Sequence, residues 1–101
     1  MTETADIVIP EAFRPDIERA VEILKEGGCS EVFVFGSLAE GCSRENSDID
    51  LAVRGCPPSS FFHLYGKLLW ELKHRVDLVD LDADHPFARW LIQNEEMLRV
   101  G

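Results

Sequence analysis

Two stretches decide the fold of this chain: Glu31–Ser37, with the sequence EVFVFGS, and Ser47–Val53, with the sequence SDIDLAV. Each contains a run of β-branched, aromatic or aliphatic residues that is typical of a buried strand. Gly36 ends the first run with a residue suited to a tight turn. Ten residues separate Ser37 from Asp48, which is short for a parallel crossover that contains a full helix. We therefore expect two neighbouring strands in a mixed or antiparallel sheet.

Helical patterns flank these strands. We expect a first helix from Arg14 to the glycines at 27–28, because proline suits a first helical turn and glycine a helix end. A second helix is predicted from Ser59 or Ser60 to about position 74, and a last one from 84–86 through Leu98. Residues 75–81 alternate like a third strand. The predicted fold class is α/β, a small mixed β-sheet with helices packed on it, in a single domain over residues 1–101.

Composition narrows the range of functions. The net charge of −9 argues against bulk binding of DNA or RNA, whose phosphates require basic residues, but it suits a basic protein partner. No apolar run approaches the ~20 residues of a membrane span. The acidic start of the chain lacks the basic residues of a signal peptide, so we expect a cytoplasmic protein. Cys29, Cys42 and Cys56, odd in number and without a close pair, predict free thiols.

The chemistry of the two stretches points to a phosphate and metal site. Side chains alternate along a strand, so Asp48 and Asp50 are expected on one face. Adjacent carboxylates repel unless a cation lies between them, and Mg²⁺ accepts oxygen ligands while leaving positions for phosphate oxygens. Gly36 would let the backbone approach a ligand closely, and Ser37 would donate a hydrogen bond to a terminal phosphate. This pattern predicts a site for a metal-bound triphosphate.

A third carboxylate is expected from a neighbouring strand. Asp77 is the best candidate, because the apolar residues on either side of it would face the core and Asp77 the opposite side. There it could share a metal or accept a proton as a general base. Asp80, Asp82 and Asp84 are rivals by residue type. The first of these would face the other way in a regular strand, and the last two are interpreted as loop and helix-cap residues.

Each motif also has a simpler interpretation. A glycine-serine pair after a strand is often only a turn, and Asp-x-Asp can be solvated charge or part of a calcium loop, although Ala52 does not fit the latter.

Phe61-Phe62 provides more aromatic surface than one buried helix face needs. We therefore expect Phe62 to be exposed and to mark a protein interface. Trp70 and Trp90 are expected to make core or partner contacts.

Taken together, Gly36-Ser37, Asp48-Ile49-Asp50 and Val76–Val79 resemble the DNA polymerase beta-type nucleotidyltransferase superfamily. The short length is similar to that of the minimal nucleotidyltransferases. The resemblance extends from the first predicted helix to the last. It implies that the protein uses ATP with Mg²⁺, transfers a nucleoside monophosphate to a hydroxyl group and releases pyrophosphate.

The resemblance also assigns roles to residues and suggests a partner. It implies that Gly36 and Ser37 hold the triphosphate, that Asp48 and Asp50 bind metal, and that Asp77 is the third acidic residue. Minimal members often pair with a helical HEPN toxin, in which case the nucleotidyltransferase is the antitoxin and adenylylates a tyrosine of the toxin. A homo- or hetero-oligomer is therefore expected.

One departure from the family pattern leaves alternatives open. Many relatives carry arginines directly after the glycine-serine pair, where this chain has Leu38, Ala39 and Glu40. The loss of arginine removes a bidentate phosphate donor, and a glutamate repels a triphosphate. Arg44 in the same segment is a candidate substitute. The alternatives are a catalytically weak or inactive module that neutralises a partner by contact, and a nucleotidyltransferase that modifies a small molecule.

Overall fold

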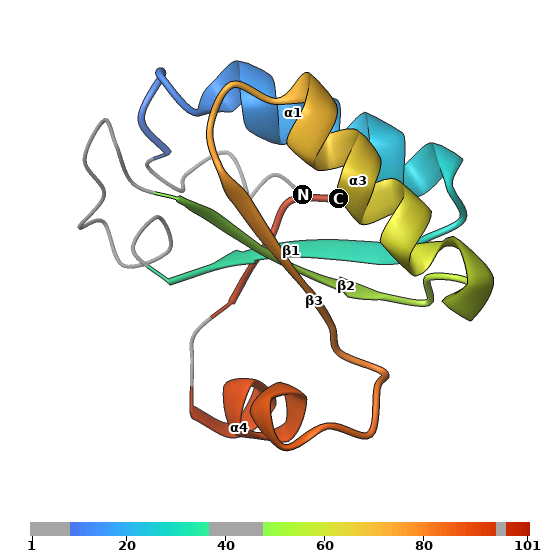
Figure 1. Ribbon diagram of the computed structural model, residues 1–101. Coiled ribbons are helices and arrows are strands. Elements are labelled where there is room, and N and C mark those ends of the chain that lie inside the picture. The colour runs from blue at the N-terminus through green and yellow to red at the C-terminus, as the bar shows by residue number, and fades with distance from the viewer. Residues whose placement is uncertain (1–8, 37–47, 95–96) are drawn as a thin grey trace.

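The computed structural model describes residues 9–36, 48–94 and 97–101. They form a mixed four-stranded sheet, with α1 and α3 on one face and α4 on the other (Figure 1). This arrangement confirms the predicted α/β fold class. None of the helices in these ranges is long and apolar enough to cross a membrane. The elements in chain order are α1 (Arg14–Glu26), β1 (Glu31–Phe35), β2 (Ile49–Arg54), the 3-10 turn η2 (Pro58–Ser60), α3 (Phe61–Glu71), β3 (Val76–Asp80), α4 (Pro86–Asn94) and β4 (Leu98–Arg99).

The sheet has the strand order β3-β2-β1-β4. β1 pairs antiparallel with β2 and β4, whereas β2 and β3 are parallel, so the expected mixed sheet is confirmed. The prediction that the last helix extends through Leu98 is wrong, because α4 ends at Asn94 and Leu98 pairs with Val34 in β4. The free edge of β1 accounts for this difference. Val32 exchanges backbone hydrogen bonds with Val100 and Gly101 there, at 2.8 and 3.0 Å, and so satisfies polar groups that would otherwise lack partners.

The larger of two cores lies between the sheet and the helices α1 and α3. Its fully buried helical residues include Ala20, Leu24 and Leu68, which pack on alternate residues of the strands. α3 begins at Phe61 after the 3-10 turn, and Ser60 makes no side-chain capping hydrogen bond, contrary to the prediction of a serine cap. Leu69 is an apolar residue of α3 that does not join this core, because its side chain is exposed.

A smaller core lies on the opposite face, under α4. It consists of Phe35, Ala52, Leu81 and Leu91. Two aromatic residues of α4, Phe87 and Trp90, keep 43% and 49% of their surface exposed. Their rings stack on each other with centroids 6.0 Å apart. α4 therefore packs on the sheet through a narrow apolar stripe, and part of its aromatic surface stays exposed to solvent.

A buried carboxylate ties α1 to the segment between α3 and β3. Asp16 accepts hydrogen bonds from the backbone N–H of Lys73 at 2.9 Å and of His74 at 2.8 Å. The Nδ1 atom of His74 lies 2.8 Å from the same oxygen. The side chain of His74 is half-buried in this contact. Asp16 therefore has the polar partners that a buried charge requires.

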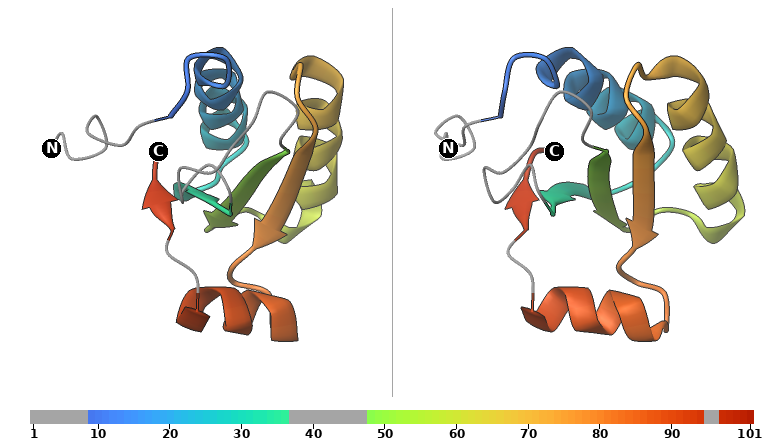
Figure 2. Two further views of the ribbon diagram at one scale, coloured as in Figure 1. Left: turned by 90° about the vertical axis from the view of Figure 1, so that its left-hand side faces the viewer. Right: turned by 60° about the vertical axis from the view of Figure 1, so that its left-hand side comes forward.

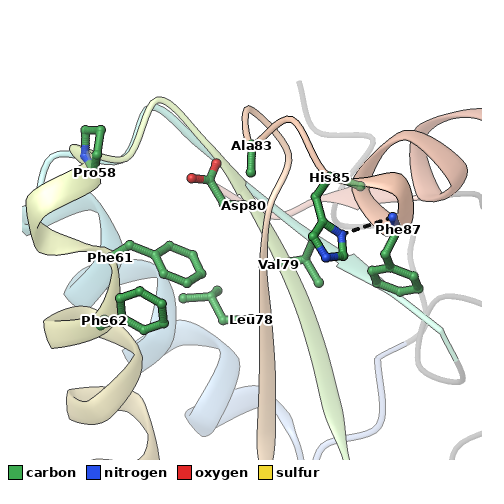
Figure 3. Close-up of a pocket in the computed structure, with 10 residues that line it drawn as sticks. Pro58, Phe61, Phe62, Leu78, Val79, Asp80, Ala83, His85 and Phe87 are labelled. Carbon is green, nitrogen blue, oxygen red and sulfur yellow. Dashed lines mark hydrogen bonds between the residues drawn. The ribbon is translucent and has the colours of Figure 1, made fainter.

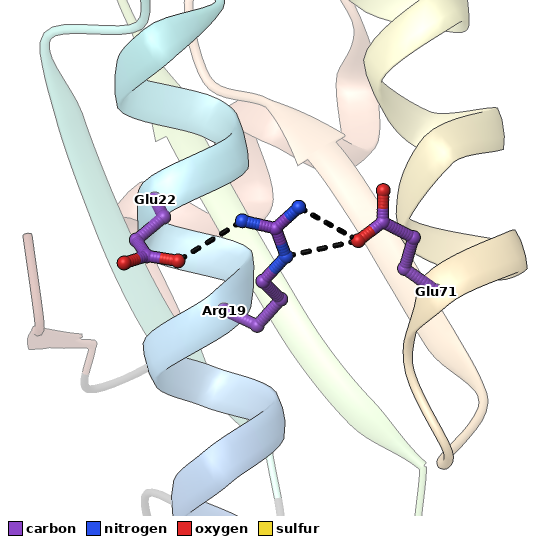
Figure 4. Close-up of polar contacts among 3 residues, drawn as sticks. All are labelled: Arg19, Glu22 and Glu71. Carbon is purple, nitrogen blue, oxygen red and sulfur yellow. Dashed lines mark hydrogen bonds and ion pairs between the residues drawn. The ribbon is translucent and has the colours of Figure 1, made fainter.

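A surface ion-pair cluster links the same two helices. The guanidinium of Arg19 lies 3.0 Å from Glu22 of α1 and 2.8 Å from Glu71 of α3 (Figure 4). Hydrogen bonds to the two carboxylates raise the pKa of Arg19 above its ordinary value. Because these groups are exposed to solvent, the cluster contributes little to stability.

A disulfide joins Cys29 to Cys56, so the prediction of free thiols is wrong for these two residues. They are 27 positions apart in sequence, but the antiparallel pairing of β1 and β2 brings them together. Ser30, beside Cys29, donates its backbone N–H to the carbonyl of Arg54 at 2.8 Å. Cys42 lies outside the described residues.

Candidate active site

The parallel register of β2 and β3 places two carboxylates side by side. Asp50 of β2 is the direct partner of Asp77 of β3. Paired residues on adjacent strands project to the same face of a sheet. Ile49 and Leu51 belong to the larger core on the α1/α3 face, so Asp50 and Asp77 project toward the face that α4 partly covers. Figure 2 shows β2 and β3 side by side, between α1 and α3 on one face of the sheet and α4 on the other.

Asp48 stands directly before β2. It is partly buried, two positions ahead of Asp50. The adjacent backbone is fixed, because Ile49 donates its N–H to the carbonyl of Arg75 at 2.8 Å. This hydrogen bond continues the pairing of β2 with β3 to Ile49, the residue next to Asp48. The three acidic residues named from the sequence therefore lie at neighbouring ends of β2 and β3.

Gly36 touches this site from the end of β1. Its φ angle is +72°, a conformation that side-chain-bearing residues rarely adopt. A Cβ atom added there would lie 2.2 Å from Oδ2 of Asp50. The bend after β1 consequently passes against the Asp50 carboxylate, and only glycine leaves room for it. The approach of a glycine-bearing turn to the aspartate pair follows from the pairing of Phe35 with Asp50.

The second residue of the predicted phosphate seat, Ser37, lies outside the described residues, as do residues 38–40 and Arg44. The roles of Ser37 in binding a triphosphate and of Arg44 as a substitute for the family arginines therefore stay predictions. The described part of the site consists of one glycine and the acidic residues on β2 and β3.

The donor set at this site suits a hard divalent cation. Asp48, Asp50 and Asp77 offer carboxylate oxygens, the ligands that Mg²⁺ prefers. Among the described residues, however, no three His, Cys, Asp or Glu side chains are gathered closely enough to hold a metal ion. The backbone register brings the three aspartates to one end of the sheet, and a chelating arrangement would require their side chains to rotate from the positions seen here.

A tyrosine of α3 contacts the acidic pair. The hydroxyl of Tyr65 lies 3.4 Å from Oδ1 of Asp77 and donates a hydrogen bond to it. Burial raises the pKa of Tyr65, and the negative charge of Asp77 raises it further. The hydroxyl is therefore held in its neutral, donating form beside the carboxylate. The sequence gives no signal for this contact, because Tyr65 fits the apolar stripe of α3 equally well.

The rival acids have structural roles in the loop between β3 and α4. Asp82 accepts a hydrogen bond from the backbone N–H of Gly55 at 2.6 Å. Asp80 accepts one from the backbone N–H of Asp82 at 3.0 Å, and Asp84 is paired with Arg89. The contacts of Asp82 agree with its interpretation as a loop residue. The cap interpretation of Asp84 stays a prediction, because the side chain that accepts from the first turn of α4 is that of His85, bonded to the N–H of Phe87 at 3.1 Å.

Comparison with known proteins shows which family and which solved structures the chain resembles. Residues 18–99 match the family model described as polymerase beta, nucleotidyltransferase. A solved structure described as a minimal nucleotidyltransferase has 29% sequence identity and a TM-score of 0.64, over 85% of this chain and 92% of that chain. A chain from a toxin–antitoxin complex with AMP-PNP has 28% identity and a TM-score of 0.61, over 80% and 70% of the two chains.

A third similar structure is a complex of a tri-AMPylated HEPN toxin from Shewanella oneidensis with an MNT antitoxin. Its matching chain has 24% identity and a TM-score of 0.57, over 84% of this chain and 70% of that chain. At this identity the likeness shows the fold alone. A search of curated protein sequences finds no significant match.

Proposed function

The chain belongs to the polymerase beta nucleotidyltransferase family, and from this premise we propose that it transfers AMP from ATP to a tyrosine hydroxyl of a HEPN-type toxin, as the antitoxin of that pair. One observation carries the proposal above the others: Asp50 and Asp77 are direct partners on parallel strands, with Gly36 packed against the carboxylate of Asp50. This is a glycine bend beside paired carboxylates, as a triphosphate with its cation requires.

In the proposed reaction, the acceptor oxygen forms a bond to the α-phosphorus of ATP. The bond from that phosphorus to the β-phosphate oxygen breaks, and pyrophosphate leaves. In this proposal Asp77 accepts the proton of the acceptor hydroxyl, a role supported by its exposure on an outer strand of the sheet. Gly36 lets the backbone approach the triphosphate, and Ser37 donates a hydrogen bond to it.

Asp48, Asp50 and Asp77 would hold Mg²⁺ in this proposal. When bound, such an ion supplies positive charge for the entering and leaving oxygens at phosphorus. The chain itself has a net charge of −9, so a triphosphate would otherwise meet a repulsive field. A cytoplasmic location is part of this proposal because ATP and Mg²⁺ are available there, although a disulfide such as Cys29–Cys56 is rare in that reducing compartment.

The similar structures support the toxin partner. A nucleotide analogue, AMP-PNP, is present in one toxin–antitoxin complex that this chain resembles at 28% identity. The HEPN toxin in another is AMPylated. Those statements concern the other proteins, and they make a HEPN protein the first acceptor to test with this chain.

The test uses α-labelled ATP, Mg²⁺ and the product of the gene beside the one for this chain, which the proposal expects to be a HEPN protein. We expect label on the HEPN protein with the wild-type chain and none with Asp50→Asn. Glu18→Gln is the matched control, because Glu18 is an exposed acid of α1, away from the site, and its loss leaves transfer unchanged. If the folded wild-type chain transfers no label from any adenine nucleotide to the HEPN protein in the presence of Mg²⁺, the proposal is contradicted.

A second candidate is neutralisation by contact alone. Leu38 and Glu40 stand where many relatives have arginines, and the described carboxylates are not gathered into a three-ligand set. A growth assay with the co-expressed toxin separates the two candidates. Under the contact mechanism the double variant Asp48→Asn/Asp50→Asn protects cells as well as the wild type, whereas the catalytic mechanism predicts that this variant loses protection.

A further inference from the structure

A groove of about 440 Å³ lies beside β3, between α3 and α4. Figure 3 shows aromatic rings of α3 on one side, the start of α4 and the loop before it on the other, and residues of β3 between them. The residues that matter for its shape are Phe61 and Phe62, His85 and Phe87, and Leu78 and Val79. Most of this lining is apolar, so the groove favours a ligand with an apolar side chain or ring.

The floor of the groove is an open strand edge. Among the described strands, β3 is an outer strand of the sheet and pairs with β2 alone. Backbone hydrogen bonds at Arg75 and Leu81 face β2, so the backbone groups of Leu78 and Asp80 face away from it in the alternating pattern of a parallel ladder. The backbone of Leu78 already interacts with the hydroxyl of Tyr65, which leaves the backbone groups of Asp80 for a partner. Such an edge can pair with an extended polypeptide while side-chain pockets on either side select its residues.

The apolar surface continues along α3 from the groove. Phe62 is 81% exposed and Trp70, two turns later, is 88% exposed, with Leu69 beside it. Gly66 lies between them, and a Cβ atom added there would meet nothing within 4 Å. Contiguous exposed aromatic surface of this kind marks a protein interface more often than a solvated face.

The charges around the groove indicate what kind of polypeptide fits. Asp80 lines the groove and Asp77 lies just before it on β3. Within the described part of the chain, neither carboxylate forms an ion pair, whereas Asp82 is paired with Arg54 and Asp84 with Arg89. Two unneutralised acids favour an occupant that carries lysine or arginine. A second copy of this chain, with the same net charge of −9, is disfavoured by repulsion.

We propose that this groove binds the acceptor polypeptide of the transfer reaction, as an extended segment with a bulky apolar side chain between Phe62 and Phe87 and a lysine or arginine against Asp80. The proposal rests on the proposed function in one respect, the placement of the acceptor hydroxyl at Asp77. Successive strand residues are about 3.3 Å apart, so a segment lying on Leu78 and Val79 reaches Asp77 with its next residues. The groove thus supplies both affinity and the direction of approach.

The test compares Phe62→Ser and Asp80→Lys with Ile92→Ser. Ile92 is an exposed apolar residue of α4 that does not line the groove, so it controls for the loss of surface hydrophobicity. Binding of the HEPN protein is measured by calorimetry without ATP, and binding of a fluorescent ATP analogue is measured separately. We expect Phe62→Ser and Asp80→Lys each to weaken HEPN binding at least about tenfold, in the range of interface hot spots. Ile92→Ser should change neither affinity.

Hydrogen exchange provides a second measurement on the unmodified chain. We expect the HEPN protein to slow exchange of the backbone amide of Asp80, which faces away from β2, more than that of amides in α1. Unchanged HEPN affinity in both groove variants would overturn the proposal, as would unchanged exchange at this edge.

The remaining outcomes are also decisive. If Phe62→Ser weakens binding of the ATP analogue and leaves HEPN binding intact, the groove holds the nucleotide base and the proposal is overturned. If the wild type forms a dimer that Phe62→Ser disrupts, with HEPN affinity unchanged, the occupant is a second copy. Because these are binding measurements, they stay informative if AMP transfer fails, and Asp50→Asn should retain HEPN binding in every case.

Discussion

The two faces of the sheet differ in how completely they are packed. On the α1/α3 face, a large apolar cluster covers most inward residues of β1, β2 and β3. The buried carboxylate of Asp16 accepts two backbone N–H bonds from the segment after α3 and contacts the ring of His74. On the α4 face, a small cluster is flanked by Asp50, Asp77 and an apolar groove. The difference indicates that one face supplies most of the stability and thereby allows the other to keep exposed acids and aromatic surface.

The alternation of β2 creates this division. Ile49 and Leu51 face the larger core, while Asp50 and Ala52 face α4. A shift of one residue in register would exchange the two sets and bury the carboxylate among aliphatic side chains. The acidic site and the stable core are therefore specified by the same six residues of sequence, and substitutions can test the two faces separately.

The largest expected effect is on the α4 face. We expect Asp50→Asn to lower the rate of AMP transfer by about 1,000-fold, or about 4 kcal/mol in the barrier, because it removes a charge that holds Mg²⁺. The free energy of unfolding should change by less than about 1 kcal/mol, as for other changes outside the core. Single-turnover transfer and urea unfolding measure the two quantities. Comparable losses in both would show that the faces are not separate in function.

The next effect tests the opposite face. Asp16→Ala leaves the backbone N–H groups of Lys73 and His74 without their acceptor, and we expect it to lower the free energy of unfolding by about 3 kcal/mol. AMP transfer per folded molecule should stay within about twofold, because Asp16 lies on the far side of the sheet. Glu18→Ala, which removes an exposed acid of the same helix, is the control for loss of charge. A large fall in transfer by folded Asp16→Ala would contradict the division.

Local patterns in the sequence predict the elements that build both faces. Alternation identifies β1, β2 and β3, and apolar spacing identifies α1 and α3, because each pattern is set by residues close together in the chain. Exposure of Phe62 is also predicted and confirmed. The resemblance to the nucleotidyltransferases, which rests on short motifs in these strands, is confirmed by the family match over residues 18–99.

Contacts between distant segments could not be predicted in this way. Asp16 looks like an ordinary first-turn acid in the sequence, and nothing near it indicates that His74 is its partner, 58 positions away. The pairing of Cys29 with Cys56 depends on the antiparallel hairpin. The pairing of Asp50 with Asp77 likewise depends on the parallel register of β2 and β3, which the sequence does not give.

A smaller effect is expected at the bend that borders the acidic pair. Gly36→Ala places a Cβ atom against the carboxylate of Asp50 and forces a residue with a side chain into φ +72°. We expect a loss of about 1–2 kcal/mol in the free energy of unfolding, the usual cost of such strain, together with slower AMP transfer.

Gly66→Ala is the matched control, because Gly66 lies inside α3 with open space around it. We expect it to stabilise the chain by up to about 1 kcal/mol, since alanine is the better helix former. Urea unfolding of both variants measures the contrast. Equal changes at the two glycines would show that the bend after β1 is not constrained by the carboxylate.

The smallest effect at neutral pH concerns Tyr65, which reaches from α3 to the acidic site. Burial and the charge of Asp77 raise its pKa above the unfolded value of about 10, so the folded state keeps the phenol proton to higher pH. This contribution to stability is fully present below about pH 10 and is lost as pH rises through the raised pKa. We expect Tyr65→Phe to lose less stability than the wild type over that range. Because Tyr65 is the only tyrosine, absorbance at alkaline pH follows its ionisation directly, and ionisation at the ordinary pKa would contradict the contact with Asp77.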